Sequence, residues 1–253
     1  MLKHCLIAAM LAAAAPLAAM AAAPADTAAA VAMPGRPKAA TDLDAGRKPA
    51  EVLRFGGLRR GDRALDLFTG SGYYAEIMAR AVGPTGSALA WEPANFVNDR
   101  SRQGLNEIKA RTPNFAWFSA PSDILALPSQ AFDFAMINLN YHDTYWQSER
   151  FHFPRMDPEA FLRTVFQSLK PGGTIVVVDH VANAGGDTRA VVEALHRIDP
   201  ATVRADFERA GFVFDGESDI LRNPADDHSK NVFDPAIRGN TDRFVYRFRR
   251  PRR

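Results

Sequence analysis

The chain has 253 residues, of which 47% are hydrophobic and 24% are charged, a composition typical of a globular protein with a hydrophobic core. The 31 Lys and Arg residues nearly balance the 29 Asp and Glu residues, so the formal net charge of +2 does not indicate a nucleic-acid partner. Cys5 is the only cysteine, which excludes a disulfide framework within the chain.

The N-terminus has the pattern of a secretory signal peptide. Lys3 precedes an uncharged, alanine-rich run that ends in the small residues Ala19 and Ala21. A retained membrane anchor is the alternative interpretation of this run. Alanine contributes little hydrophobic free energy and Pro16 interrupts the run, so we favour a signal peptide that is cleaved after Ala21.

Three segments follow from this interpretation. Residues 1–21 are the expected signal peptide, and residues 22–45, which are rich in Ala and Pro, are expected to be a flexible lead-in. Residues 46–253 are expected to form one domain. We therefore expect a periplasmic or secreted protein that has no stable membrane insertion after the signal is cleaved.

From Pro49 onward, apolar runs typical of strands alternate with amphipathic stretches typical of helices, which is the pattern of a three-layer α/β fold. The first five strands alternate with crossovers and should be parallel, whereas the polar connection over residues 221–242 favours an antiparallel edge. The expected strands are Ala64–Phe68, Ala88–Trp91, Phe115–Ser119, Phe132–Asn138, Thr174–Asp179, Phe212–Ser218 and Phe244–Phe248. The expected helices are Tyr74–Val82, Asn98–Arg111, Pro158–Leu169 and Ala201–Ala210.

The most informative stretch is a strand that leads through a glycine turn into a helix. Asp66 lies within the strand, and Gly70 and Gly72 form the turn, where the missing Cβ atoms let the backbone approach a ligand. The next strand ends at Glu92, whose carboxylate can accept hydrogen bonds from both hydroxyls of a ribose. With Ala75, the two glycines also match the pattern G-x-G-x-x-A of a dinucleotide site. An acid within the first strand disfavours that alternative and suits a ligand with a cationic amine.

The glycine turn and the acid before it resemble motif I of class I S-adenosylmethionine (SAM) dependent methyltransferases. Further elements follow in the order of that family: Glu92 matches the acid that binds the ribose, and Asp123 matches the acid that binds the adenine amino group. A proline-glycine turn at residues 169–173 precedes the fifth strand. The resemblance covers about residues 49–250.

The resemblance implies a Rossmann-like three-layer α/β sandwich. Its seven-stranded, mostly parallel sheet would have the order 3-2-1-4-5-7-6, with strand 7 antiparallel. It also implies SAM as the cofactor. The cofactor-binding residues that it implies are Asp66, Gly70, Gly72, Glu92, Asp123 and Asn138.

The C-terminal part is similar to a narrower group, the exported predicted methyltransferases of bacteria. The segments that carry this likeness are Asn223–His228, Val232–Pro235 and Thr241–Phe244. The likeness agrees with the signal peptide.

The segment after the fourth strand concentrates aromatic and titratable side chains. Ligands of open α/β sheets bind beyond the carboxyl ends of the strands, so this segment should face the transferable methyl group. His142 is a candidate general base, Tyr141 a candidate residue for holding the acceptor, and Asp179, at the end of the fifth strand, a candidate partner that orients the imidazole. Asp143 is an alternative partner. The structural alternative is that the rings anchor the loop to the core and that His142 has no chemical role.

No metal is expected. The place of Asp179 is similar to that in catechol-type O-methyltransferases, but His180 stands where those enzymes have Asn. Asn138 or Asn140 stands where a second Asp is needed, which leaves too few hard oxygen ligands for magnesium.

Residues 138–141 also lack the prolines of the Asn-Pro-Pro-Tyr motif, so we expect no nucleic-acid acceptor.

The function that we predict is methyl transfer from SAM to a small-molecule or cell-envelope acceptor. A non-catalytic SAM-binding module of the same fold is the first alternative. A dinucleotide-dependent oxidoreductase is the second.

Overall fold

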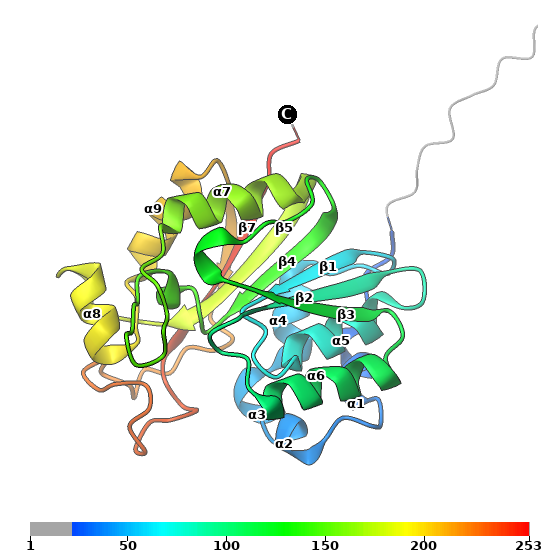
Figure 1. Ribbon diagram of the computed structural model, residues 1–253, viewed down its shortest axis with the longest axis horizontal. Coiled ribbons are helices and arrows are strands. Elements are labelled where there is room, and N and C mark those ends of the chain that lie inside the picture. Colours follow the sequence, from blue (N-terminus) through cyan, green and yellow to red (C-terminus); the bar gives the residue numbers. More distant parts are fainter. Residues whose placement is uncertain (1–21, 253) are drawn as a thin grey trace, which may run out of the picture.

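The computed structural model describes residues 22–252 and shows one sheet between two layers of helices (Figure 1). The strands are β1 (Arg63–Leu67), β2 (Ser87–Pro93), β3 (Phe115–Ala120), β4 (Phe132–Asn138), β5 (Leu169–His180), β6 (Val213–Ser218) and β7 (Arg243–Arg249). Their order is β3-β2-β1-β4-β5-β7-β6. Strands β1 to β5 pair in parallel, and β7 is antiparallel to both of its neighbours. The predicted fold class and strand order are confirmed.

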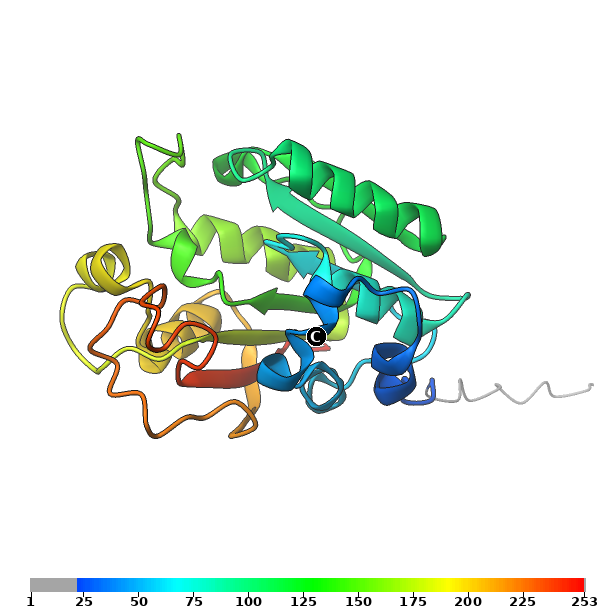
Figure 2. The same ribbon diagram turned by 90° about the horizontal axis from the view of Figure 1, so that it is seen from below.

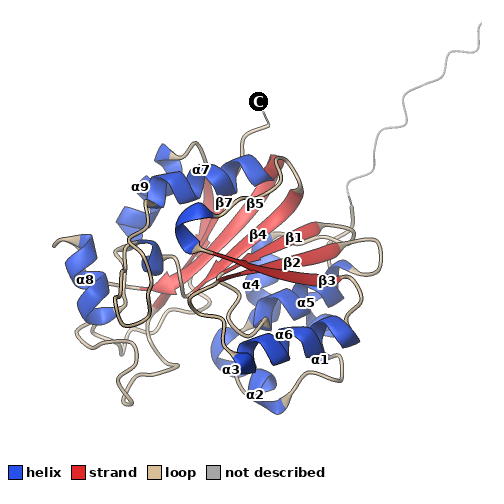
Figure 3. Cartoon of the chain, viewed as in Figure 1, coloured by secondary structure: helices blue, strands red, loops and turns tan. Residues whose placement is uncertain are grey.

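Helices cover both faces of the sheet (Figure 3). The helices are α1 (Thr27–Ala32), α2 (Lys38–Thr41), α3 (Asp44–Arg47), α4 (Pro49–Gly56), α5 (Tyr73–Val82), α6 (Asp99–Arg111), α7 (Pro158–Ser168), α8 (Thr188–Leu195) and α9 (Pro200–Arg209). The alternation of side chains along β1 sends Leu65 and Leu67 into the core under α7 and α9, and Ala64 into the core under α4 and α5. Within residues 22–252 no helix has the length and apolarity needed to cross a bilayer.

The proline-glycine turn predicted ahead of the fifth strand lies inside β5. Gly172 has a φ of 83°, and the register between β4 and β5 shifts between Phe132 and Phe134. The chain therefore makes its turn as an irregularity of the strand, and β5 begins at Leu169 instead of Thr174.

The prediction that residues 22–45 are flexible is wrong. They form α1, α2 and the start of α3, and Ala30 is buried against α4 and α5. The buried Arg36 guanidinium donates two hydrogen bonds of 2.8 Å to the Asp44 carboxylate, which also accepts one of 2.6 Å from the Tyr73 hydroxyl. Small residues that pack closely have the same composition as a flexible segment, so composition alone could not separate the two. The expected signal peptide lies outside the described residues.

Candidate functional site

Two buried acids lie at the carboxyl ends of the neighbouring strands β1 and β2. Asp66 Oδ2 accepts hydrogen bonds from Thr69 Oγ1 at 2.7 Å and from the Ala75 backbone N–H at 3.1 Å. Glu92 Oε2 accepts a hydrogen bond of 2.7 Å from the Gly70 backbone N–H. Both carboxyl groups thereby hold the glycine loop, Asp66 from the strand that leads into it and Glu92 from the adjacent strand.

The backbone of this loop takes a path that favours glycine. Gly70 and Gly72 have φ values of 59° and 80°. A Cβ on Gly72 would lie 2.6 Å from Ile108 Cδ1, whereas the space beside Gly70 is open to at least 4 Å and can admit a ligand. Phe68 has a φ of 55°, uncommon for a bulky residue, and its ring packs edge-on against Trp91 at 4.8 Å. The packed ring keeps the strained backbone in place.

Burial changes the acidity of both carboxyl groups. It raises the pKa of Asp66 to about 7, because the hydrogen bonds from Thr69 and Ala75 only partly offset the loss of water. It likewise raises the pKa of Glu92 to about 7, with further contributions from the negative charges of Asp66 and Asp143. A ligand that brings a cation or hydroxyl donors would stabilise the ionised forms.

A cavity of about 860 Å³ opens beyond the carboxyl ends of β4 and β5. Its walls come from both ends of the described chain, since the N-terminal helices and the loop before β7 lie beside one another (Figure 2). The N-terminal side of the cavity is lined by Leu43, Gly46 and Arg47, and the C-terminal side by Val232, Arg238 and Arg243. The floor is formed by His142, Asp143 and His180. The aromatic walls are formed by Phe96, Trp146, Phe151 and Phe233.

His142 lies at the centre of a polar cluster on the cavity floor. Its Nδ1 atom is 2.8 Å from Oδ1 of Asp179, a fully buried residue whose carboxylate also accepts the backbone N–H groups of His142 and His180. Its Nε2 atom is 3.6 Å from Asp143 Oδ1. The structure thus places Asp179 where the sequence expected a residue that orients the imidazole.

The protonation state of His142 bears on the predicted role as a general base. Burial lowers the pKa of His142, but the negative charges of Asp179 and Asp143 outweigh burial and raise the pKa to about 9. The two carboxylates therefore stabilise the protonated form of the ring in this arrangement. A cationic imidazole must lose its proton before it can accept one from a substrate.

Tyr141 was predicted to lie in the acceptor site, and the structure places it in the core instead. Its side chain is fully buried, its hydroxyl donates a 2.8 Å hydrogen bond to Asp206, and its ring packs against Phe207 at 5.3 Å. The short 3-10 turn at His142–Thr144 rotates successive side chains by about 120°, so Tyr141 faces the core while His142 and Asp143 face the cavity.

The remaining predicted cofactor residues differ in their placement. Asn138 ends β4 and is half-buried, and its amide makes no side-chain hydrogen bond among residues 22–252. Asp123 is exposed in the 3-10 turn Ser122–Ile124 and lines a small hollow with Met156 and Phe161, not the large cavity. The predicted roles of Asn138 and Asp123 in cofactor binding stay predictions.

Sequence reasoning missed His196. This residue follows α8 with a φ of 51°, and its ring lies 5.5 Å from that of His142 and 5.4 Å from that of Trp146. The contact joins segments far apart in the chain, so no local sequence pattern predicts it. Arg47 was missed as well, because the short helix α3 that carries it was not predicted.

Comparisons with known proteins match this chain to methyltransferases. Residues 43–117 match the profile of the protein-L-isoaspartate(D-aspartate) O-methyltransferase family. The ubiquinone/menaquinone biosynthesis C-methyltransferase UbiE of Pasteurella multocida is 26% identical over 123 residues, which are 49% of this chain and 41% of that protein. UbiE of Salmonella arizonae is 25% identical over 166 residues, or 66% and 59% of the two chains. The chain spans about half the length of the curated relatives it matches.

Solved structures share the fold over most of the chain. A SAM-dependent methyltransferase from Aquifex aeolicus superposes with a TM-score of 0.56 at 18% identity, covering 85% of this chain and 99% of that one. One from Mesorhizobium loti gives a TM-score of 0.55 at 20% identity, covering 82% and 100%. The chain has the class I SAM-dependent methyltransferase fold. The comparisons accordingly point to SAM as its cofactor, as predicted.

The family profile matches only part of the chain. The family profile covers β1, the glycine loop, β2 and the start of β3, and it ends before the aromatic segment that lines the cavity. A structure described as the [4+2]-cyclase SpnF superposes as well, with a TM-score of 0.59 at 17% identity over 91% of this chain and 98% of that one. The methyltransferase fold therefore does not by itself fix the reaction or the acceptor.

Proposed function

We propose that the protein transfers a methyl group from SAM, bound over the carboxyl ends of β1 and β2, to an acceptor in the adjoining cavity. The observation that carries this proposal is the pair of buried carboxyls, Asp66 and Glu92, around the open space at Gly70. Burying such acids costs free energy unless a ligand compensates them. The hydroxyls of the SAM ribose would donate to Glu92, and its ammonium group would lie toward Asp66. A nicotinamide dinucleotide brings no such ammonium group, which disfavours the oxidoreductase alternative.

The proposed acceptor is a small molecule or an envelope component with an apolar part. Leu43, Phe151 and Phe233 are all exposed, and all line the cavity. Large apolar side chains exposed around a cavity are typical of ligand-binding sites, and aromatic rings also attract a cationic sulfonium. The UbiE relatives are named for ubiquinone and menaquinone biosynthesis, which supports a small-molecule acceptor.

We propose that His142 and Asp179 serve the acceptor and not SAM. His142 lines the cavity, and Asp179 fixes its ring through Nδ1. Because SAM needs no protonation of its leaving group, positioning of the acceptor supplies much of the rate. In this arrangement Asp179 is a positioning residue that acts through His142.

Export is also part of the proposal. The pattern of residues 1–21 supports a signal peptide that is cleaved after Ala21. Pro24, three residues further on, already pairs with Arg59 in the folded domain. A mature chain that begins at residue 22 would therefore keep every described element.

Calorimetry with SAM, S-adenosylhomocysteine and NAD tests the cofactor. We expect SAM to bind more tightly than NAD and Glu92→Ala to weaken SAM binding by about 2–4 kcal/mol, because it removes charge-assisted hydrogen bonds to two ribose hydroxyls. Glu51→Ala is the control, since Glu51 is exposed on α4. Unchanged SAM affinity in Glu92→Ala would refute the site.

Turnover needs a separate measurement. Incubation of the protein with isotopically labelled SAM and cell-envelope extract should yield a labelled product. SAM binding without any labelled product would favour the non-catalytic module over the enzyme.

A further inference from the structure

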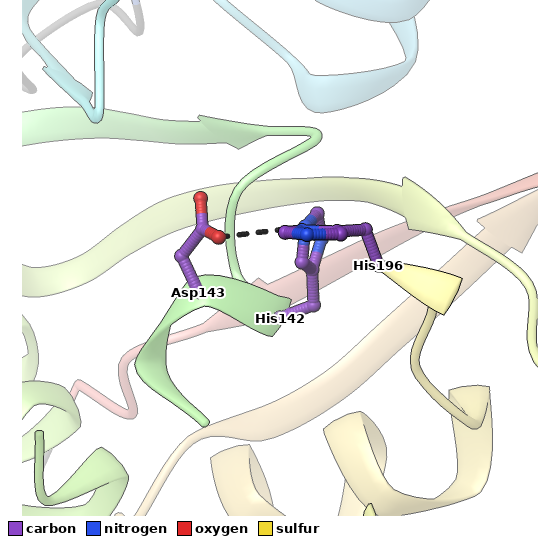
Figure 4. A group of neighbouring side chains, drawn as sticks. All are labelled: His142, Asp143 and His196. Carbon is purple, nitrogen blue, oxygen red and sulfur yellow. Dashed lines mark ion pairs between the residues drawn. The ribbon is translucent and has the colours of Figure 1, made fainter. Parts of the chain in front are cut away.

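We propose that His142, Asp143 and His196 form a binding site for a divalent transition-metal ion on the floor of the cavity. One potential ligand atom from each residue lies within 4.8 Å of those of the other two. Figure 4 shows the Asp143 carboxylate directed at the two imidazole rings. Two imidazoles and one carboxylate suit Zn²⁺ and the neighbouring first-row ions, whereas magnesium prefers oxygen ligands alone. The expectation of a metal-free protein considered only oxygen ligands, and it did not include His196.

Two of the three ligands are oriented by hydrogen bonds on their far sides. His142 uses Nδ1 for Asp179 at 2.8 Å, which turns Nε2 toward Asp143. Asp143 uses Oδ2 to accept a 2.8 Å hydrogen bond from the Asn140 amide, which leaves Oδ1 facing His142. Metal-binding histidines commonly donate their second N–H to a carboxylate in this way. The fully buried Asp179, held also by two backbone N–H groups, is such a partner.

The distances leave room for an ion. Two ligands of a tetrahedral zinc, at about 2.0–2.1 Å from the metal, are about 3.3 Å apart. His142 Nε2 and Asp143 Oδ1 are 3.6 Å apart, so this pair needs a shift of only a few tenths of an ångström. His196 is half-buried at the end of α8, between Trp146 and Phe233, and its ring would move toward the other two ligands.

The proposed site would keep an open position. All three residues line the cavity, so the fourth ligand of a tetrahedral ion would lie on the cavity side. Three protein ligands and one exchangeable position are typical of zinc sites that handle substrates. If the proposed function is right, an oxygen or nitrogen atom of the acceptor would take that position.

Metal titration without SAM tests the site itself. The purified full-length chain, stripped with a chelator and free of any polyhistidine tag, is titrated with Zn²⁺ by calorimetry and with Co²⁺ by visible absorption. We expect one Zn²⁺ to bind per chain and Co²⁺ to compete for the same site. Bound Co²⁺ should show the visible absorption bands of a tetrahedral or five-coordinate ion. His196→Asn should weaken Zn²⁺ binding at least tenfold, and Asn tolerates the left-handed backbone found there, with a φ of 51°.

His152→Asn is the matched control, because His152 has the same φ of 51° but is exposed and outside the cluster. It should bind Zn²⁺ as the unchanged protein does. Asp143→Asn, a second variant, should lose affinity as His196→Asn does. Absence of stoichiometric Zn²⁺ or Co²⁺ binding, or full affinity in both cluster variants, would overturn the proposal. SAM affinity measured with chelator present keeps this outcome separate from failure of the proposed function.

Discussion

Single side chains at the glycine loop carry charges that the fold does not fully stabilise. Burial raises the pKa of Asp66 and of Glu92 to about 7 in each case. Because these folded-state pKa values lie above those of an unfolded chain, ionisation destabilises the empty protein. The contribution of protonated Asp66 and Glu92 to the stability of the empty protein is therefore fully present below about pH 4, and it is lost as the pH rises through about 7.

Binding of SAM should show the opposite dependence on pH. The ionised carboxylates are the forms that accept the ribose hydroxyls and attract the ammonium group, so we expect SAM affinity to increase from pH 6 to pH 8. Each carboxyl group should contribute roughly up to tenfold over this range. Calorimetry at several pH values measures the effect, and Glu92→Gln should remove the part of the pH dependence that comes from Glu92. Affinity that is independent of pH, or that falls as the pH rises, would contradict the assignment.

Tyr141 should matter for stability and not for binding. Tyr141→Phe removes its hydrogen bond to Asp206 in the core, and we expect the free energy of unfolding to fall by about 1–2 kcal/mol. Urea denaturation measures this loss, and SAM affinity should stay unchanged. Weaker acceptor binding with normal stability would return Tyr141 to the acceptor site.

At the level of elements, the N-terminal helices act as one wall of the site. The Arg36 side chain is almost fully buried and pairs with Asp44, which also accepts the Tyr73 hydroxyl. Leu43 and Arg47, on either side of Asp44, line the cavity. The ion pair therefore couples the packing of α3 to the shape of the site.

Breaking this ion pair should destabilise the domain. Asp44→Ala leaves the Arg36 cation buried without its carboxylate, and we expect a loss of about 2–3 kcal/mol in urea denaturation. Asp42→Ala is a matched control, because Asp42 pairs with Lys38 at the exposed surface. It should cost less than about 1 kcal/mol. Equal losses in the two variants would show that burial of the Arg36 pair adds nothing.

Periodicity predicted the strands of the sheet and α5, α6, α7 and α9, because each presents a clear apolar face. It failed for α1, which buries only Thr27 and Ala30, for the eight-residue helix α4, and for α8, which buries only Val192. The placement of Asp66 and Glu92 at the glycine loop could be predicted from sequence, because both follow from the strand pattern. His196 could not, since only tertiary packing brings it to His142.

For the molecule as a whole, a bound cofactor should stabilise the fold. A ligand at about 100 times its Kd adds about 2.7 kcal/mol, which corresponds to a rise in Tm of about 5–10 °C for a domain of this size. We expect S-adenosylhomocysteine to produce this shift and NAD at the same concentration to produce none. A thermal shift assay measures both, and Glu92→Ala should abolish the shift. A larger shift with NAD would instead favour the oxidoreductase alternative.

Export can be tested on the same whole-chain scale. We expect mass spectrometry of the protein from its native cells to find a chain that begins at residue 22, in the periplasmic or secreted fraction. An intact N-terminus in a cytoplasmic fraction would contradict this expectation.

The contact between the N-terminal and C-terminal walls of the cavity also determines when, during folding, the site can form. Arg243 Nη1 donates a 3.0 Å hydrogen bond to the carbonyl of Gly46, a contact that spans 197 residues. Contacts of such long range form late, because the intervening chain must be ordered first. On the ribosome, the pocket is thus incomplete until nearly all of the chain has emerged. A protein that crosses a membrane unfolded would accordingly arrive empty, and it would have to find its methyl donor on the far side.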